Sequence, residues 1–138
     1  MYEKLLVAVD HSKISERVLA AARDLALLSK GEVWVLHLRE LEAMPRAGIV
    51  PSESTGEAQA SVDAAVAELS QAGIKAHGEV RNTLFGHPGR EIVDEAKALD
   101  AGVIVMGSRG RGDMAGLVLG STAHKVIHLA DRPVLVVR

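Results

Sequence analysis

The chain contains no cysteine and few aromatic residues. The lack of cysteine excludes disulfide scaffolds, thiolate zinc sites and thiol catalysis together. The aromatic side chains are Tyr2, Trp34 and Phe85, which are too few for a surface that stacks bases. The formal net charge is −2, from 18 acidic and 16 basic residues, so no field that attracts a polyanion is expected. We therefore do not expect nucleic-acid binding as a main role.

Long hydrophobic runs are also missing. The apolar run 5–9 stops at Asp10 and is too short for the core of a signal peptide or for a membrane span. We therefore expect a cytoplasmic protein without a membrane partner. A length of 138 residues suits one domain, residues 1–138, that buries a core without metals or disulfides.

Short apolar runs alternate with longer amphipathic segments along the whole chain. Strands are expected at 5–9, 32–38, 74–80, 103–106 and 134–137, with 74–80 near a sheet edge. Helices are expected around the apolar stripes of 14–28, 62–69, 88–99 and 119–130. This alternation predicts a single-domain, three-layer α/β/α sandwich with a parallel sheet.

Two local features complete this prediction. Ser12 or Ser15 is expected to cap the first helix, and Gly31 lies just past its end. Residues 39–57 are rich in proline and glycine and have no usable period. They are expected to form a long mobile loop, the one candidate for a lid.

A glycine-rich motif is the strongest functional signal. Gly107-Ser108-Arg109-Gly110 leaves the fourth expected strand, and Gly120-Ser121-Thr122 follows at a helix start. Glycines let backbone N–H groups approach phosphate oxygens, and a helix N-terminus adds donors and a positive dipole end. Asp10, Leu38 (or His37) and Gly107 all end predicted strands, where ligands bind in parallel sheets.

Two better-known phosphate motifs do not fit this glycine stretch. Gly107 and Gly112 have the spacing of a P-loop, but Asp113 stands where lysine is required. The run from Gly110 to Ala115 matches a loose dinucleotide pattern, yet the helix and the acidic residue that this pattern needs are not in place. Both readings are rejected.

These residues carry a family resemblance. The spacing Gly-x₂-Gly-x₉-Gly-Ser, the opening Leu-Leu-Val-Ala-Val-Asp-x-Ser, the run Val-Leu-His-Leu at 35–38 and the Pro-Val-Leu-Val-Val ending resemble the universal stress protein family. The resemblance implies a Rossmann-like (adenine nucleotide alpha hydrolase-like) sheet of five parallel strands in the order 3-2-1-4-5. It also implies the ATP-binding branch, and a homodimer that pairs 134–137 antiparallel.

The resemblance also assigns roles to residues around a nucleotide. The implied contacts run from the adenine and ribose end to the phosphates: Ala8, Val9 and Asp10; Leu38 on the adenine; Met106 and Gly107 at the ribose and α-phosphate; and Gly110, Gly120, Ser121 and Thr122 on the phosphates. Arg109 and Arg111 add positive charge. A magnesium ion on the phosphates is implied, with Asp10 or Asp113 as possible protein ligands. His11 departs from the family pattern, which has glycine there.

Each site residue also has a structural explanation. Gly107 and Gly110 can be turn glycines, Ser121 or Thr122 a helix cap, Asp10 a cap at a helix entry, Arg109 a solvated charge and Met106 a core residue. His124 and His128 are spaced to share a helix face, but no glutamate or third ligand accompanies them. We expect these two histidines to be surface or packing residues.

The sequence therefore leaves three functions open. An ATP-, ADP- or AMP-binding stress regulator acting as a homodimer on a downstream protein is favoured. A slow ATP hydrolase or nucleotide-transfer enzyme on the same site, and a dimeric scaffold without nucleotide, are the alternatives. No clear general base, arginine finger or nucleophile elbow is found, so no catalytic residue is assigned.

Overall fold

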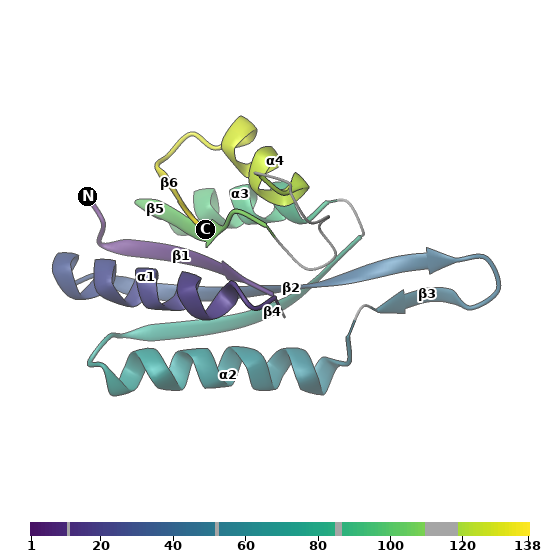
Figure 1. Ribbon diagram of the computed structural model, residues 1–138, viewed down its shortest axis with the longest axis horizontal. Coiled ribbons are helices and arrows are strands. Elements are labelled where there is room, and N and C mark those ends of the chain that lie inside the picture. The colour runs from purple at the N-terminus through teal and green to yellow at the C-terminus, as the bar shows by residue number, and fades with distance from the viewer. Residues whose placement is uncertain (11, 52, 85–86, 110–118) are drawn as a thin grey trace.

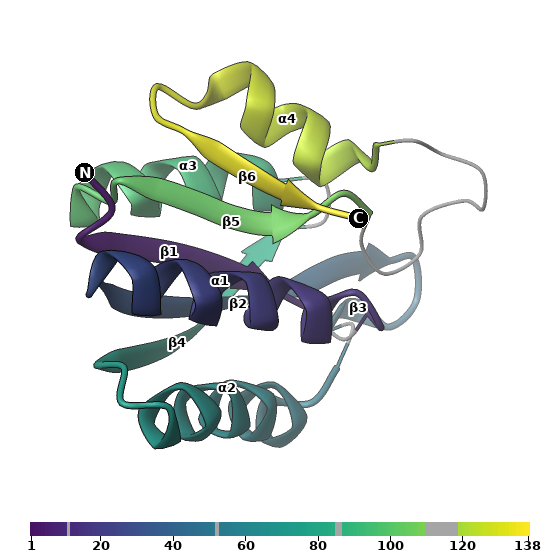
Figure 2. The ribbon, with the colours of Figure 1, turned by 60° about the vertical axis from the view of Figure 1, so that its left-hand side comes forward.

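The computed structural model describes residues 1–138 except 11, 52, 85–86 and 110–118 (Figure 1). Its elements are β1 (Lys4–Val9), α1 (Ser15–Ser29), β2 (Glu32–Met44), β3 (Gly48–Pro51), α2 (Thr55–Gln71), β4 (Ala76–Leu84), α3 (Pro88–Leu99), β5 (Val103–Gly107), α4 (Ser121–Leu129) and β6 (Val134–Val137). Helices α1 and α2 cover one face of the sheet, and α3 and α4 cover the other (Figures 1 and 2). The expected three-layer α/β architecture is confirmed.

The parallel strands lie in the order β4-β2-β1-β5-β6. Counting these five along the chain, this is the expected order 3-2-1-4-5. The sheet has one further strand, because β3 pairs antiparallel with the distal part of β2. As expected, β4 lies at an edge, since its described pairing is with β2 alone.

The central strands are apolar because both of their faces are buried. Along β2, Val33 and Val35 pack in the cluster under α1 and α2. Leu36 packs in the second cluster, under α3 and α4, and Trp34 lies against it. Side chains alternate across a strand, so a strand between two helical layers shows a continuous hydrophobic run.

The expected loop at 39–57 is wrong over most of its length. β2 continues to Met44 and turns back into β3, and α2 begins at Thr55. Figure 1 shows this β2–β3 hairpin projecting from the body of the sheet. Residues of the hairpin such as Met44 and Ile49 are exposed. A regular hydrophobic period in a sequence arises where one face of an element is buried. A strand pair that packs against no core therefore shows no such period.

The start of α1 also differs from expectation. Ile14 occupies the N-cap position, and no side chain caps the helix. The Ser15 hydroxyl instead donates to the Asp10 carbonyl at 2.8 Å. At the other end, Lys30 adopts the left-handed conformation (φ 55°) and the Gly31 N–H donates to the Ala26 carbonyl. Gly31 is required because a Cβ there would overlap the Tyr2 carbonyl.

Arg132 fastens the turn before β6 to the rest of the domain. Its guanidinium donates to the carbonyls of Ala96 and Ala101 at 2.9 and 2.8 Å. It also donates to the exposed Asp131 carboxylate, and this hydrogen bond holds the pKa of Asp131 below its usual value. Three partners for one cation fix the path of the chain into β6. Among the described residues, no helix is long and apolar enough to cross a membrane.

Candidate functional site

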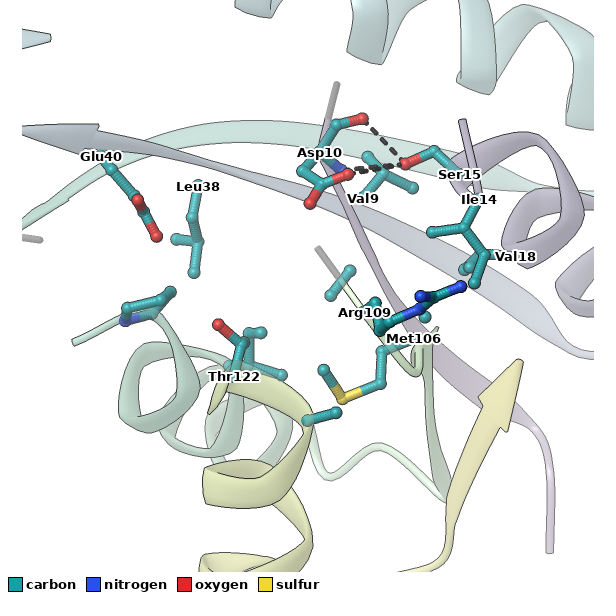
Figure 3. Close-up of a pocket in the computed structure, with 15 residues that line it drawn as sticks. Val9, Asp10, Ile14, Ser15, Val18, Leu38, Glu40, Met106, Arg109 and Thr122 are labelled. Atoms are coloured by element: carbon teal, nitrogen blue, oxygen red, sulfur yellow. Dashed lines mark hydrogen bonds between the residues drawn. The ribbon is translucent and has the colours of Figure 1, made fainter. Parts of the chain in front are cut away.

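A pocket lies where the carboxyl ends of β1 and β5 and the middle of β2 meet the first turns of α1, α3 and α4 (Figure 3). The pocket is open to solvent, and its volume together with the open space at its mouth is about 560 Å³. The lining residues are Ala8, Val9, Asp10, Ile14, Ser15, Val18, Leu38, Glu40, Pro88, Ile92, Met106, Gly107, Arg109, Thr122 and Ala123.

Asp10 is held in place by a tight turn between β1 and α1. Its Oδ1 accepts the Ser12 N–H at 2.7 Å and the Ser15 hydroxyl at 3.1 Å. The backbone N–H of Asp10 donates to the Ser15 hydroxyl oxygen at 3.2 Å. These bonds form a turn typical of aspartate. Asp10 therefore shapes the turn into α1 and also lines the pocket; its contact with a ligand stays a prediction.

Gly107 lines the pocket at the end of β5 and lies close to the start of α1. A Cβ on Gly107 would lie 2.9 Å from Ile14 Cγ2 and 3.1 Å from the Arg109 carbonyl oxygen. The described glycines with positive φ do not include Gly107. The glycine is thus required for close approach and not for a left-handed backbone.

The backbone brings the start of α4 to the end of β5. The buried Ser108 donates its N–H to the Val137 carbonyl at 2.7 Å, and its carbonyl accepts the Gly120 N–H at 2.6 Å. Gly120 is the N-cap of α4, and no side chain caps this helix. The first turn of α4 therefore presents backbone donors and a positive dipole end beside Gly107, with Thr122 in the pocket lining.

The structure brings together most of the predicted site residues. The pocket lining contains Ala8, Val9, Asp10, Leu38, Met106, Gly107, Arg109 and Thr122. Gly120 and Ser121 begin α4 next to this lining. Gly110, Arg111, Asp113 and His11 lie outside the described residues. The glycine motif and the end of β1 thus form one site, although they are far apart in the sequence.

Two acidic residues near the site were not predicted. Glu40 lines the pocket, two positions after Leu38 on the same face of β2. The expected loop at 39–57 concealed it, although strand alternation continued from Leu38 would have found it. Glu53 pairs with His37, and both side chains are buried. His37, considered with Leu38 as a strand-end residue, is therefore outside the pocket.

Charged side chains line the pocket from three strands. Glu40 comes from β2, Asp10 follows β1 and Arg109 follows β5, whereas Thr122 lies at the start of α4, which adjoins the start of α3 (Figure 3). Within the described part of the chain, no group of three or more His, Asp or Glu side chains has metal-binding geometry. His124 and His128 are exposed on α4.

The fold and this site agree with a comparison against family models. The model of the universal stress protein family matches residues 1–138. The chain belongs to this family. Its curated relatives include universal stress protein YxiE of Bacillus subtilis, which is 32% identical over 151 aligned positions, with all of both chains covered.

Solved universal stress proteins share the fold at similar identity. A universal stress protein structure from Archaeoglobus fulgidus has a TM-score of 0.77 at 32% identity, covering 100% of both chains. A structure of the Archaeoglobus fulgidus universal stress protein in complex with dAMP has a TM-score of 0.75 at 30% identity, covering 99% of this chain and 98% of that one. A structural relative of this family member therefore binds an adenine nucleotide.

Proposed function

We propose that this universal stress protein binds an adenine nucleotide in the pocket at the carboxyl ends of β1 and β5 and the middle of β2. The observation that carries the proposal is the start of α4, which no side chain caps and which lies beside Gly107 and Thr122. Anions bind at such helix N-termini through backbone N–H groups and the dipole. The dAMP complex of the Archaeoglobus fulgidus protein supports adenine as the base.

The phosphates are expected at α4 and not at α3, although both helices begin at the pocket. The first residue of α3 is Pro88, which has no N–H to donate. Glu40 also lines the pocket, and a carboxylate repels phosphate. In the first turn of α4, Ser121 and Thr122 each have a backbone N–H and a hydroxyl. The Gly120 N–H is already bonded to the Ser108 carbonyl. Arg109 adds a positive charge at this end.

The proposed ligand is ATP with Mg²⁺. ADP and AMP, which are products of ATP hydrolysis, are expected to bind more weakly. Mg²⁺ neutralises phosphate charge, and Asp10 is the described carboxylate nearest in the lining to Gly107 along the sheet. Asp10 is tied to Ser12 and Ser15, which suits a positioning role more than proton transfer. We therefore propose that the protein holds ATP as a cytoplasmic regulator of a downstream partner, without rapid hydrolysis.

Gly120→Asp is expected to abolish this binding. Gly120 has φ −72° and ψ 165°, which aspartate adopts without strain. A carboxylate at the phosphate position costs several kcal/mol, so affinity should fall about 100-fold or more. At a free concentration of 100 times its Kd, Mg·ATP should raise the free energy of unfolding of the wild-type protein by about 2.7 kcal/mol. The measurement is the melting temperature with and without nucleotide, together with isothermal titration.

The matched control is Gly56→Asp. Gly56 lies in the first turn of α2, and a Cβ there meets nothing within 4 Å. This variant should bind as wild type does. If millimolar Mg·ATP leaves the wild-type melting temperature unchanged, the proposed function is wrong. Phosphate release at an ordinary enzymatic rate that Gly120→Asp abolishes would replace the holding role with hydrolysis.

The proposed assembly is a homodimer that joins the two β6 edges. Among the described strands β6 pairs with β5 alone, and Leu135 is 39% exposed on it. An open apolar edge of this kind favours pairing with another strand. The Pro133 carbonyl accepts the Ile104 N–H of β5, and the Val137 carbonyl accepts the N–H of Ser108 just after β5, so alternation directs the N–H of Val136 outward.

Val136→Pro is therefore expected to convert the dimer to a monomer. Proline removes an edge donor without removing a bond to β5. Light scattering coupled to size exclusion measures the mass, and Val136→Ala is the control that keeps the donor. A wild-type monomer at micromolar concentration, or a Val136→Pro dimer, would contradict this assembly.

A further inference from the structure

Ser108 connects the start of α4 to the end of β6. Its N–H donates to the Val137 carbonyl at 2.7 Å, and its carbonyl accepts the Gly120 N–H at 2.6 Å. Ser108 is 4% exposed and directly follows Gly107 of the pocket lining. One buried residue therefore holds both the helix end proposed to bind phosphate and the strand proposed to form the dimer.

The other ends of these two elements are joined by a short connection, residues 130–133. Arg132 in this connection is fixed by hydrogen bonds to two backbone carbonyls, one in α3 and one just before β5. Val134 of β6 packs against the apolar cluster that contains Val126 of α4. Because α4 and β6 are attached at both ends and share a core, a displacement of one displaces the other.

The side of α4 that faces away from α3 adjoins the open edge of the sheet. Lys125 lies against the start of α3, since a Cβ on Gly89 would come within 2.8 Å of Lys125 Cβ. Ile127 is two positions further on, about 200° around the helix, so it lies on the opposite side, where it is 47% exposed. α3 contacts β1, β2 and β4, whereas α4 contacts β6 (Figure 2). A strand that pairs with β6 therefore also meets α4.

Both connected elements belong to the less stable parts of the fold. No side chain caps the start of α4, so its first turn depends on backbone contacts. β6 has four residues, Val134–Val137, none of which is fully buried. Uncapped helix ends and short edge strands open most easily. A ligand or partner that orders one of the two elements therefore lowers the free energy needed to order the other.

We propose that nucleotide binding at the start of α4 and self-association at β6 are coupled, so that each strengthens the other. This inference rests on the proposed function and adds how the site regulates assembly. Phosphate bound to the N–H groups of Ser121 and Thr122 fixes the first turn of α4, and Ser108 transmits this order to Val137. Thermodynamic linkage then requires that dimer formation raises the affinity of each nucleotide site.

The test measures the dimer dissociation constant by sedimentation velocity with and without saturating Mg·ATP. A subunit of the dimer should bind Mg·ATP about fivefold more tightly than a monomer, or better. Because a dimer binds two nucleotides, saturating Mg·ATP should then tighten the dimer about 25-fold or more. Titration of Mg·ATP on wild-type protein below and above its dimer dissociation constant measures the change in nucleotide affinity directly.

Val136→Pro separates the coupling from the dimer itself. This variant is expected to be monomeric, so it should bind Mg·ATP with the affinity of the wild-type monomer at every protein concentration. Val136→Ala is the matched control and should keep the concentration dependence of wild type. In Val136→Pro, Mg·ATP should also slow amide hydrogen exchange of 131–138, because Ser108 joins α4 to β6 within one subunit. The internal control is Ala76–Leu84 (β4), an edge strand at the other side of the sheet, whose exchange should stay the same.

Failure of the coupling is distinguishable from failure of nucleotide binding. If wild type binds Mg·ATP and dimerises, but the two constants are independent or nucleotide weakens the dimer, the coupling is wrong and nucleotide binding stands. Unchanged exchange of 131–138 in Val136→Pro would show that the path through Ser108 is wrong. If wild type binds Mg·ATP but is monomeric at all concentrations, the coupling and the proposed assembly are wrong. If wild type does not bind Mg·ATP, the coupling and the proposed function are both wrong.

Discussion

Replacing His37 with leucine is expected to lower the free energy of unfolding by about 3 kcal/mol or more. His37 Nε2 and Glu53 Oε1 form a hydrogen-bonded pair, and the two side chains are 1% and 2% exposed. The substitution removes the imidazole and leaves the Glu53 carboxyl group buried beside an apolar side chain. Desolvation of a buried carboxylate is costly when its partner is lost.

The pair also has a structural consequence for the pocket. His37 lies on β2 between Val9 of β1 and Val80 of β4, and Glu53 precedes the N-cap of α2, Ser54. The contact therefore fixes the return of the β2–β3 hairpin against the sheet, one residue before Leu38 of the pocket. We expect His37→Leu to weaken nucleotide binding less than it weakens folding, because no pocket residue is removed.

Urea denaturation of a double-mutant cycle measures this interaction. The variants are His37→Leu, Glu53→Leu and the two together. Each single change should destabilise the protein, and the double variant should be more stable than the sum predicts, since two apolar side chains replace the pair. Additive losses would show that the two side chains do not stabilise one another.

Leu36→Ala is expected to destabilise the domain by about 2–5 kcal/mol. Leu36 is 1% exposed in the cluster under α3 and α4. It pairs with Ala8 on β1 and with Glu79 on β4, so the surrounding backbone is held by strands on both sides. Such a rigid site relaxes little, and the lost methyl groups leave a cavity.

The control for this truncation is Leu28→Ala. Leu28 is 84% exposed near the end of α1, so the same chemical change should alter stability by less than about 0.5 kcal/mol. Both variants are compared by urea denaturation at a common pH. Equal losses at Leu36 and Leu28 would contradict the assignment of Leu36 to the core.

The sequence predicted the elements that pack against the core. β1 and β5 appear as apolar runs because helices cover both of their faces, and α3 was located by Pro88 and its stripe of Ile92 and Ala96. The β2–β3 hairpin was missed because its exposed residues have no burial pattern. The prediction that Ser12 or Ser15 caps α1 was wrong because the Ser15 hydroxyl bonds to Asp10 instead. This partner depends on the conformation of the turn and not on composition.

The candidate site divides in the same way. Asp10, Leu38, Gly107 and Thr122 were predicted because strand ends and a helix start mark the ligand edge of a parallel sheet, and the pocket contains all four. Glu40 was hidden by the expected loop. Glu53 could not be found from sequence, because its relation to His37 is a contact across 16 positions with no spacing rule.

By itself, the sequence determined the α/β class, the order of the main elements and the family, since these depend on periodicity and on the glycine motif. The tertiary structure decided which side chains face one another. It placed Glu40 in the pocket and paired His37 with Glu53. The physical reason is that hydrophobic burial repeats regularly along a chain, whereas a contact between distant polar groups depends on the twist and register of the strands between them.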